Sequence, residues 1–129
     1  MKSFTDLSQS KVLAEILPLE SADMQYISFR HEDDTIAWIP QLGTPSKYDI
    51  PCWSLSSLLD VLPPYLFELE RGIDLNVYPH LTHKGWHCSY MPNNIESMQK
   101  DKFKLITSED NLIDACVAMI EKLHKQKLL

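Results

Sequence analysis

Glycine is scarce in this chain of 129 residues. Because only Gly43, Gly72 and Gly85 are present, the sequence contains neither a glycine-rich loop that cradles phosphates nor a dinucleotide-binding fingerprint. It also lacks a G-x-S-x-G nucleophile elbow and the paired cysteines of a zinc ribbon. These absences disfavour a nucleotide cofactor, and we expect no cofactor of any kind.

Positive charge is also low. The chain has 12 Lys and Arg against 18 Asp and Glu, for a net charge of -6. Nucleic-acid binding depends on basic side chains that displace counterions from phosphates, so we expect no nucleic-acid partner. The acidic residues are spread along the chain, which is more typical of a soluble surface than of a DNA mimic.

Long hydrophobic runs are missing. The longest, residues 115–120, is far too short to span a bilayer, and the first residues contain no apolar leader segment. We therefore expect a cytoplasmic protein without a membrane partner. Hydrophobic residues make up 44% of the chain and charged residues 23%, which together with the length predicts a single globular domain over residues 1–129.

The three cysteines are odd in number and isolated: Cys52, Cys88 and Cys116. This pattern favours reduced thiols in a reducing compartment, and we predict that all three are free core side chains. Cys52 is also a candidate nucleophile, because the dipole of the helix that follows it would favour a thiolate. The flanking Pro51 and Trp53 indicate a packed structural position instead.

Hydrophobic spacing predicts three amphipathic helices. The first begins at Thr5 or Asp6 and ends at Pro18, the second is capped by Ser54, and the last is capped by Ser108. The predicted buried stripes are Val12, Leu13, Ile16 and Leu17, then Leu55, Leu58, Leu59 and Leu62, and finally Leu112, Cys116, Met119, Ile120 and Leu123. Among these, Leu59 and Ile120 are expected to lie in one shared core.

Alternating residues predict the strands. Residues 24–30 and 35–39 are joined by an acidic loop. In a later strand, residues 84–91, alternation places Trp86, Cys88 and Tyr90 on one face. The expected inward side chains of the first two strands are Ile27 and Phe29, and Ile36 and Trp38, respectively.

A hairpin over residues 65–77 has the clearest predicted register. A three-residue loop ending at Gly72, with a positive φ, places Leu69 opposite Ile73. This register keeps Phe67, Leu69, Ile73 and Leu75 inward. It leaves Glu68 and Asp74 outward as neighbours, in a possible acidic interaction patch.

The order of these elements predicts the fold class. It lacks the regular strand–helix alternation of a parallel sheet. We therefore expect an α+β protein, with an antiparallel, meander-like sheet of about five strands and three helices packed mainly on one face.

His80, His83, His87 and Cys88 form the main cluster of metal-capable side chains, and zinc accepts such ligands. However, their spacing would align only on a helix, which Pro79 and Gly85 oppose. In a strand, His87 and Cys88 point to opposite faces. The favoured interpretation is a histidine-bearing loop that leads into a strand, with no bound metal.

Three blocks of the sequence carry a family resemblance: residues 13–24, residues 50–55 running on to Pro63, and residues 110–116 running on to Leu123. They resemble small uncharacterised proteins carried by phages and prophages of gut Bacteroidetes. This resemblance implies an intracellular protein of a mobile element, and it carries no activity or functional residues with it. Such proteins often bind a host or element-encoded protein.

These observations favour a non-enzymatic intracellular protein-interaction module of a phage or mobile element, with a protein as its partner. The alternative is a small metal-dependent enzyme that uses His80, His83 and His87. Aromatic side chains often anchor interfaces. The three tryptophans nevertheless lie in apolar patterns that first indicate a core: Trp38, Trp53 and Trp86.

Overall fold

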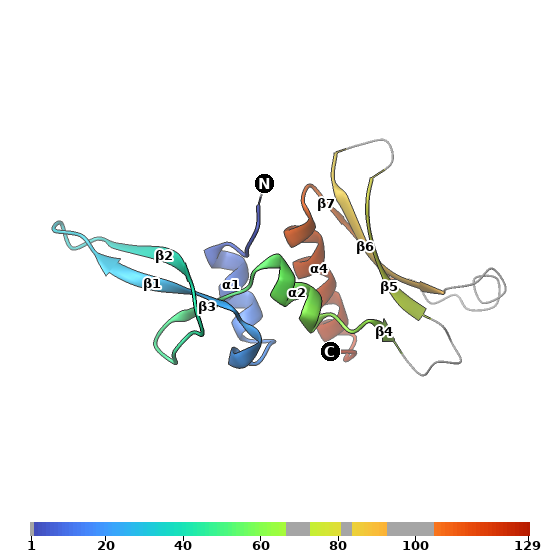
Figure 1. Ribbon diagram of the computed structural model, residues 1–129, viewed down its shortest axis with the longest axis horizontal. Coiled ribbons are helices and arrows are strands. Elements are labelled where there is room, and N and C mark those ends of the chain that lie inside the picture. Colours follow the sequence, from blue (N-terminus) through green and yellow to red (C-terminus); the bar gives the residue numbers. More distant parts are fainter. Residues whose placement is uncertain (1, 67–72, 81–83, 93–104) are drawn as a thin grey trace. The chain divides into compact units, whose positions relative to one another are not determined.

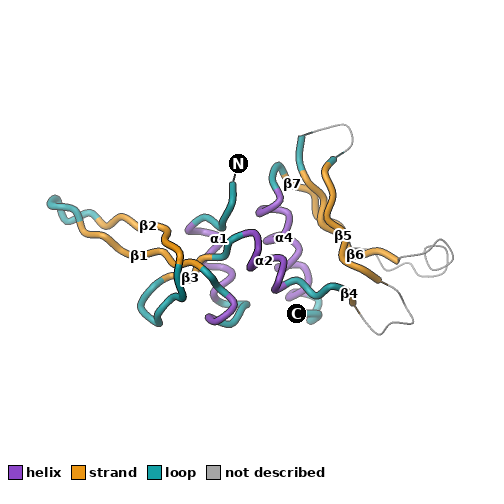
Figure 2. The backbone as a smooth tube through the Cα atoms, viewed as in Figure 1, coloured by secondary structure: helices purple, strands orange, loops and turns teal. Residues whose placement is uncertain are grey.

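The computed structural model describes residues 2–66, 73–80, 84–92 and 105–129 (Figure 1). These residues form three α-helices, a short 3-10 helix and two antiparallel sheets, which confirms the α+β class. The expected single meander is wrong, because the strands divide into a three-stranded and a four-stranded sheet (Figure 2). No helix in this described part is long and apolar enough to cross a bilayer.

The chain divides into two compact units, residues 2–61 and residues 62–129. The single-domain organisation stays a prediction. The elements of the first unit are α1 (Leu7–Ala14), η1 (Leu19–Ser21), β1 (Met24–Arg30), β2 (Ile36–Leu42), β3 (Ile50–Cys52) and α2 (Leu55–Val61).

Helix α1 begins at Leu7 and is capped by Asp6, one of the two expected caps. The Asp6 side chain accepts a hydrogen bond from Gln9 N at 2.8 Å, and Gln9 Oε1 accepts one from Asp6 N at 3.1 Å. This reciprocal capping box satisfies two backbone donors of the first turn. The helix ends at Ala14, before the proline that was expected to stop it. Leu13 is buried, whereas Val12 is 42% exposed, so only part of the predicted stripe faces the core.

Strand β1 lies in the middle of the first sheet, in the order β2-β1-β3 with antiparallel neighbours. Its inner side chains are Met24 and Tyr26, which form a buried cluster with Cys52. The predicted inward face of Ile27 and Phe29 is therefore wrong. Both faces of β1 carry apolar residues, so alternation alone does not select the buried one. Phe4, Leu7, Trp38 and Ile50 pack against the cluster.

Helix α2 is capped as expected, since Ser57 N donates to Ser54 Oγ at 3.3 Å. Leu58 is fully buried, but Leu59 is 36% exposed. The predicted burial of Leu59 is therefore wrong. Leu58 and, just after the helix, Leu62 are the buried leucines here, and Leu59 lies at the margin of the face that they form.

The second unit combines a four-stranded sheet with one long helix, and its strands pair in chain order as an antiparallel meander. Its elements are β4 (Tyr65–Leu66), β5 (Ile73–Pro79), β6 (Trp86–Pro92), β7 (Leu105–Glu109) and α4 (Leu112–Lys125). Helix α4 packs against β6 and β7. Its buried positions include the predicted Cys116, Met119, Ile120 and Leu123, and Cys88 and Tyr90 of β6 are buried as well.

Strands β4 and β5 pair in a different register from the predicted one. Leu66 lies opposite Ile73, the place predicted for Leu69, so the predicted register is wrong. Burial agrees with the observed pairing, because Leu66 is buried and Tyr65 is 49% exposed. The connection over residues 67–72 lies outside the described residues.

The cap of α4 also differs from the expected one. Ser108 belongs to β7 rather than to the helix, and Asn111 is the cap, because its Oδ1 accepts a hydrogen bond from Asp114 N at 2.9 Å. β7 was not predicted. Its buried Thr107 donates to the carbonyl of Ala115 at 2.8 Å, which ties the strand to the first turn of α4.

Candidate functional site

Two of the three predicted metal-binding histidines lie side by side. The ring centroids of His80 and His87 are 3.7 Å apart, because His80 directly follows β5 and His87 lies in the adjacent strand β6. His83 lies outside the described residues. Among those that are described, no three His, Cys, Asp or Glu side chains gather as a metal site.

The His87 ring is held by neighbours on its own face of the sheet. Its Nδ1 lies 2.6 Å from Ser108 Oγ, and its centroid lies 4.9 Å from that of Tyr78. Desolvation and the nearby His80 lower the pKa of His87. The neutral imidazole is therefore favoured, and this is the form that binds metals.

Cys88, the fourth member of the predicted cluster, belongs to the opposite face of β6. It is fully buried and lies opposite Val77 and Thr107 in the neighbouring strands. A hydrogen bond with Cys116 and burial together raise the pKa of Cys88. The alternation expected from the sequence is confirmed, and Cys88 does not share a site with His87.

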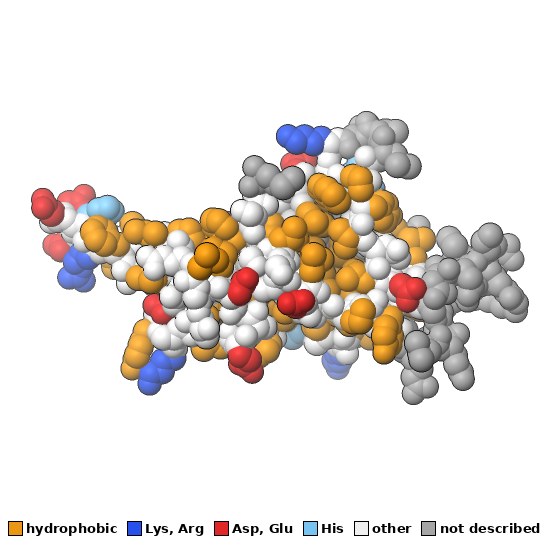
Figure 3. Space-filling model, viewed as in Figure 1, with side chains coloured by type: hydrophobic (Ala, Val, Ile, Leu, Met, Phe, Trp, Pro, Cys, Tyr) orange, Lys and Arg blue, Asp and Glu red, His pale blue; other side chains and the backbone are white. Residues whose placement is uncertain are grey.

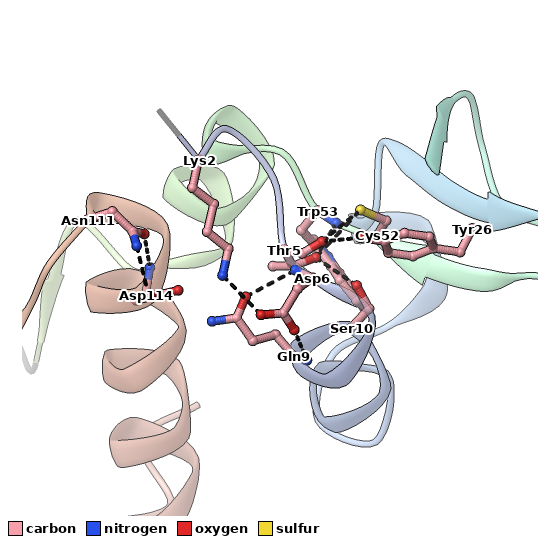
Figure 4. Close-up of polar contacts among 10 residues, drawn as sticks. All are labelled: Lys2, Thr5, Asp6, Gln9, Ser10, Tyr26, Cys52, Trp53, Asn111 and Asp114. Atoms are coloured by element: carbon pink, nitrogen blue, oxygen red, sulfur yellow. Dashed lines mark hydrogen bonds and ion pairs between the residues drawn. The ribbon is translucent and has the colours of Figure 1, made fainter. Parts of the chain in front are cut away.

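Cys52 lies in a buried polar network centred on Thr5 (Figure 4). Thr5 Oγ1 is 3.6 Å from Cys52 Sγ and 2.8 Å from Ser10 Oγ, and it accepts a hydrogen bond from Trp53 N at 3.1 Å. The Tyr26 hydroxyl donates to the Thr5 carbonyl at 2.7 Å. The network connects the segment before α1 to the end of β3 through hydrogen bonds.

This environment opposes nucleophilic chemistry at Cys52. Burial raises the pKa of the Cys52 thiol, and burial also raises the pKa of Tyr26 to about 12. A catalytic cysteine needs a lowered pKa and an adjacent base, whereas the Cys52 thiol contacts hydroxyl groups and a carbonyl. The interpretation of Cys52 as a buried core residue is confirmed. All three cysteines are free thiols.

Only one of the two residues of the predicted acidic patch belongs to the described part of the chain. Asp74 lies in β5, half-buried, opposite Tyr65 and Met91 of the neighbouring strands. Glu68 lies outside the described residues, as does Gly72 with its predicted positive φ. The predicted position of Glu68 opposite Asp74 is wrong, because Tyr65 lies opposite Asp74. A role of these two side chains in an interaction patch stays a prediction.

Sequence reasoning missed an exposed apolar surface on the β1–β2 hairpin. The antiparallel register places Ile27 opposite Ile39 and Phe29 opposite Ala37, all on one face. We call these four side chains the hairpin face. Phe29 is 53% exposed and Ile39 is 44% exposed, whereas the alternation in residues 24–30 predicts that Ile27 and Phe29 lie in the core.

The hairpin face belongs to a two-stranded ribbon, because β3 pairs with β1 only from Met24 to Tyr26 while β1 and β2 continue past it (Figure 1). Hydrophobic side chains follow the hairpin in the space-filling view (Figure 3). Apolar surface gathered in this way marks interaction sites in soluble proteins. The exposed large hydrophobic residues of the hairpin are Phe29 and Ile39 on the hairpin face and Ile36 and Leu42 on the opposite face.

No family model, curated protein or solved structure matches this chain. The resemblance to phage and prophage proteins stays a prediction.

The tip of the ribbon adds charge to the apolar surface. His31, Glu32, Asp33 and Thr35 line a shallow, open depression. The Asp33 carboxylate accepts hydrogen bonds from the Thr35 hydroxyl at 2.6 Å and from Thr35 N at 3.1 Å. These bonds lower the pKa of Asp33. The depression therefore keeps a negative charge at neutral pH and lies at the end of the hairpin face.

Proposed function

We propose that this protein is a non-enzymatic protein-interaction module and that the hairpin face is its binding surface. The observation that carries the proposal is the exposure of Phe29 and Ile39 on one face of a ribbon that no third strand extends in the described chain. The candidate nucleophile Cys52 is a buried thiol with a raised pKa. The net charge of -6 favours a protein partner over nucleic acid.

A bound partner would cover the apolar side chains that the ribbon leaves exposed to water. A two-stranded hairpin is marginally stable on its own, and large apolar side chains in water favour any partner that covers them. Removing apolar surface from water is favourable by about 25 cal/mol per Å², and the part of this that exceeds the entropy cost of association stabilises a complex. Aromatic side chains commonly supply the central contacts of an interface. Phe29, the aromatic and 53% exposed side chain of the hairpin face, is the expected anchor.

Affinity purification from the native host, followed by binding measurements with the purified partner, tests this proposal. A Phe29→Ser/Ile39→Ser double variant removes the apolar contacts of the hairpin face. Leu42→Ser is the control, because Leu42 is 81% exposed and lies on the other face of the same β1–β2 hairpin. We expect the wild type and the control to bind the same protein, and the double variant to bind it at least about tenfold more weakly.

Equal binding by the double variant and the wild type would contradict the proposal, provided that both unfold at the same denaturant concentration. Equal weakening by Leu42→Ser would also contradict it, because the loss would then not be specific to one face.

We also propose that the protein acts in the cytoplasm and belongs to a phage or other mobile element. Three free, buried thiols agree with a reducing compartment, and the three resembling sequence blocks support the mobile-element origin. Detection of the protein in the cytoplasmic fraction of its host tests the location.

A second candidate function is metal-dependent chemistry at His80, His83 and His87. The observation that favours it is the 3.7 Å separation of the His80 and His87 rings, since paired imidazoles bind transition metals. Metal analysis of untagged protein tests it. One equivalent of zinc that is lost in His87→Ala, but kept in the control His124→Ala, would support this alternative. Protein without bound metal, and without affinity for added zinc, would exclude it.

A further inference from the structure

The backbone of β1 has an open edge where β3 stops. His31 N donates to the Thr35 carbonyl at 2.8 Å, and Gly43 N donates to the Asp23 carbonyl at 3.1 Å. Hydrogen-bonded pairs alternate along an antiparallel ladder, so the odd-numbered residues of β1 direct their backbone groups toward β2. The even-numbered residues direct theirs to the opposite edge.

On that opposite edge, β3 ends its pairing at Tyr26. The backbone groups of Ser28 and Arg30 therefore have no partner strand in the described chain. The outer edge of β2 differs, because Pro40 faces it and has no N–H to donate. The two edges are thus unequal, and an added strand pairs better beside Ser28 and Arg30 of β1.

A second copy of this chain fits the surface poorly. The hairpin face consists of four side chains, two of them only partly exposed, whereas a stable dimer buries about 800 Å² on each partner. Two copies would also bring together chains that each carry a net charge of -6. A short segment of another protein needs less area and meets no such repulsion.

The tip selects the charge of that segment. Glu32 and Asp33 line the shallow depression at the end of the hairpin face, and Asp33 is held in place by its two hydrogen bonds from Thr35. A lysine or arginine side chain placed there would meet carboxylates. Charge complementarity therefore points to a partner segment that is basic at one end.

We infer that the hairpin face binds an extended, apolar segment of a partner protein that pairs with β1 beside Ser28 and Arg30 and places a lysine or arginine in the depression at Glu32 and Asp33. The inference rests on the proposed function and specifies its partner. Strand addition of this kind gives affinity through backbone hydrogen bonds and specificity through alternate side chains.

Selection from a random peptide display library on the immobilised full-length chain tests the inference. We expect the selected peptides to alternate apolar residues and to carry Lys or Arg at one end. Glu32→Lys should lower the affinity for the selected peptides by roughly two- to fivefold at low salt. The matched control Glu20→Lys changes the net charge equally, lies on the exposed η1 segment of the same unit, and should leave binding unchanged. Phe29→Ser should abolish the selection.

The outcomes separate the two proposals. Peptides that depend on Phe29 but show no Lys or Arg preference and no response to Glu32→Lys would overturn the inference and leave the proposed function standing. Peptides that bind Phe29→Ser as well as the wild type would overturn both. A selection that yields no binding peptides would overturn the inference, because the surface would then not accept a short segment.

Discussion

At the scale of single residues, Thr5 organises more of the first unit than its place before α1 suggests. Its hydroxyl contacts Ser10, Cys52 and Trp53, and its carbonyl accepts the Tyr26 hydroxyl (Figure 4). All of these groups are buried. Buried polar groups are costly without partners, so the loss of one hydroxyl leaves several groups unsatisfied.

We predict that Thr5→Val destabilises the protein by about 1–3 kcal/mol, because valine keeps the shape of threonine but leaves Trp53 N and the Ser10 hydroxyl without their partner. Urea denaturation measures the change in the free energy of unfolding. Thr5→Ser retains the hydroxyl and serves as the control. If Thr5→Val were as stable as Thr5→Ser, the network would contribute nothing.

The histidine pair predicts a pH dependence. The folded-state pKa of His87 is lowered by desolvation and by His80, so the unfolded chain binds a proton more readily. The stability from the neutral His87 ring is therefore fully present above about pH 6.5, the ordinary pKa of histidine, and is lost as the pH falls below it. His87→Asn should reduce the loss of unfolding free energy between about pH 7.5 and about pH 5.5. His124→Asn is the control, and an equal reduction there would contradict the assignment.

At the scale of elements, α2 shows how neighbouring leucines differ. Leu58 is fully buried, whereas Leu59 is 36% exposed. Leu58→Ala should cost about 2–5 kcal/mol because it leaves a cavity in the core. Leu59→Ala should cost less than about 1 kcal/mol, since part of its side chain already contacts water. Paired denaturant melts compare the two, and equal losses would show that the helix face is misassigned.

The start of α4 supplies a second test at this scale. Asn111 caps the helix through Asp114 N, so Asn111→Ala should destabilise the protein by about 0.5–2 kcal/mol. Ser108→Ala removes only the contact with the His87 ring and should cost less. A larger loss for Ser108→Ala would restore Ser108 as the cap that the sequence suggested.

At the scale of the whole molecule, the sequence predicts the α+β class and most helices, since periodicity and caps are local signals. The sequence does not predict which face of a strand is buried where this depends on residues far away in the chain. Met24 and Phe29 lie on opposite faces of β1, and the packing of Phe4 and Leu7 on the Met24 face decides which face is buried. Strand β7 was missed because Ser108 resembles a helix cap. The exposure of the hairpin face was missed because exposed apolar residues have the same sequence pattern as core residues.

Site-specific photo-cross-linking in the native host is the most direct test of the hairpin face as a binding surface. A photoreactive amino acid replaces Phe29 or Ala37 on that face, or Leu42 on the opposite face of the β1–β2 hairpin. We predict that positions 29 and 37 cross-link to the same partner protein and that position 42 does not. Cross-links from Leu42 without cross-links from Phe29 and Ala37 would contradict the account.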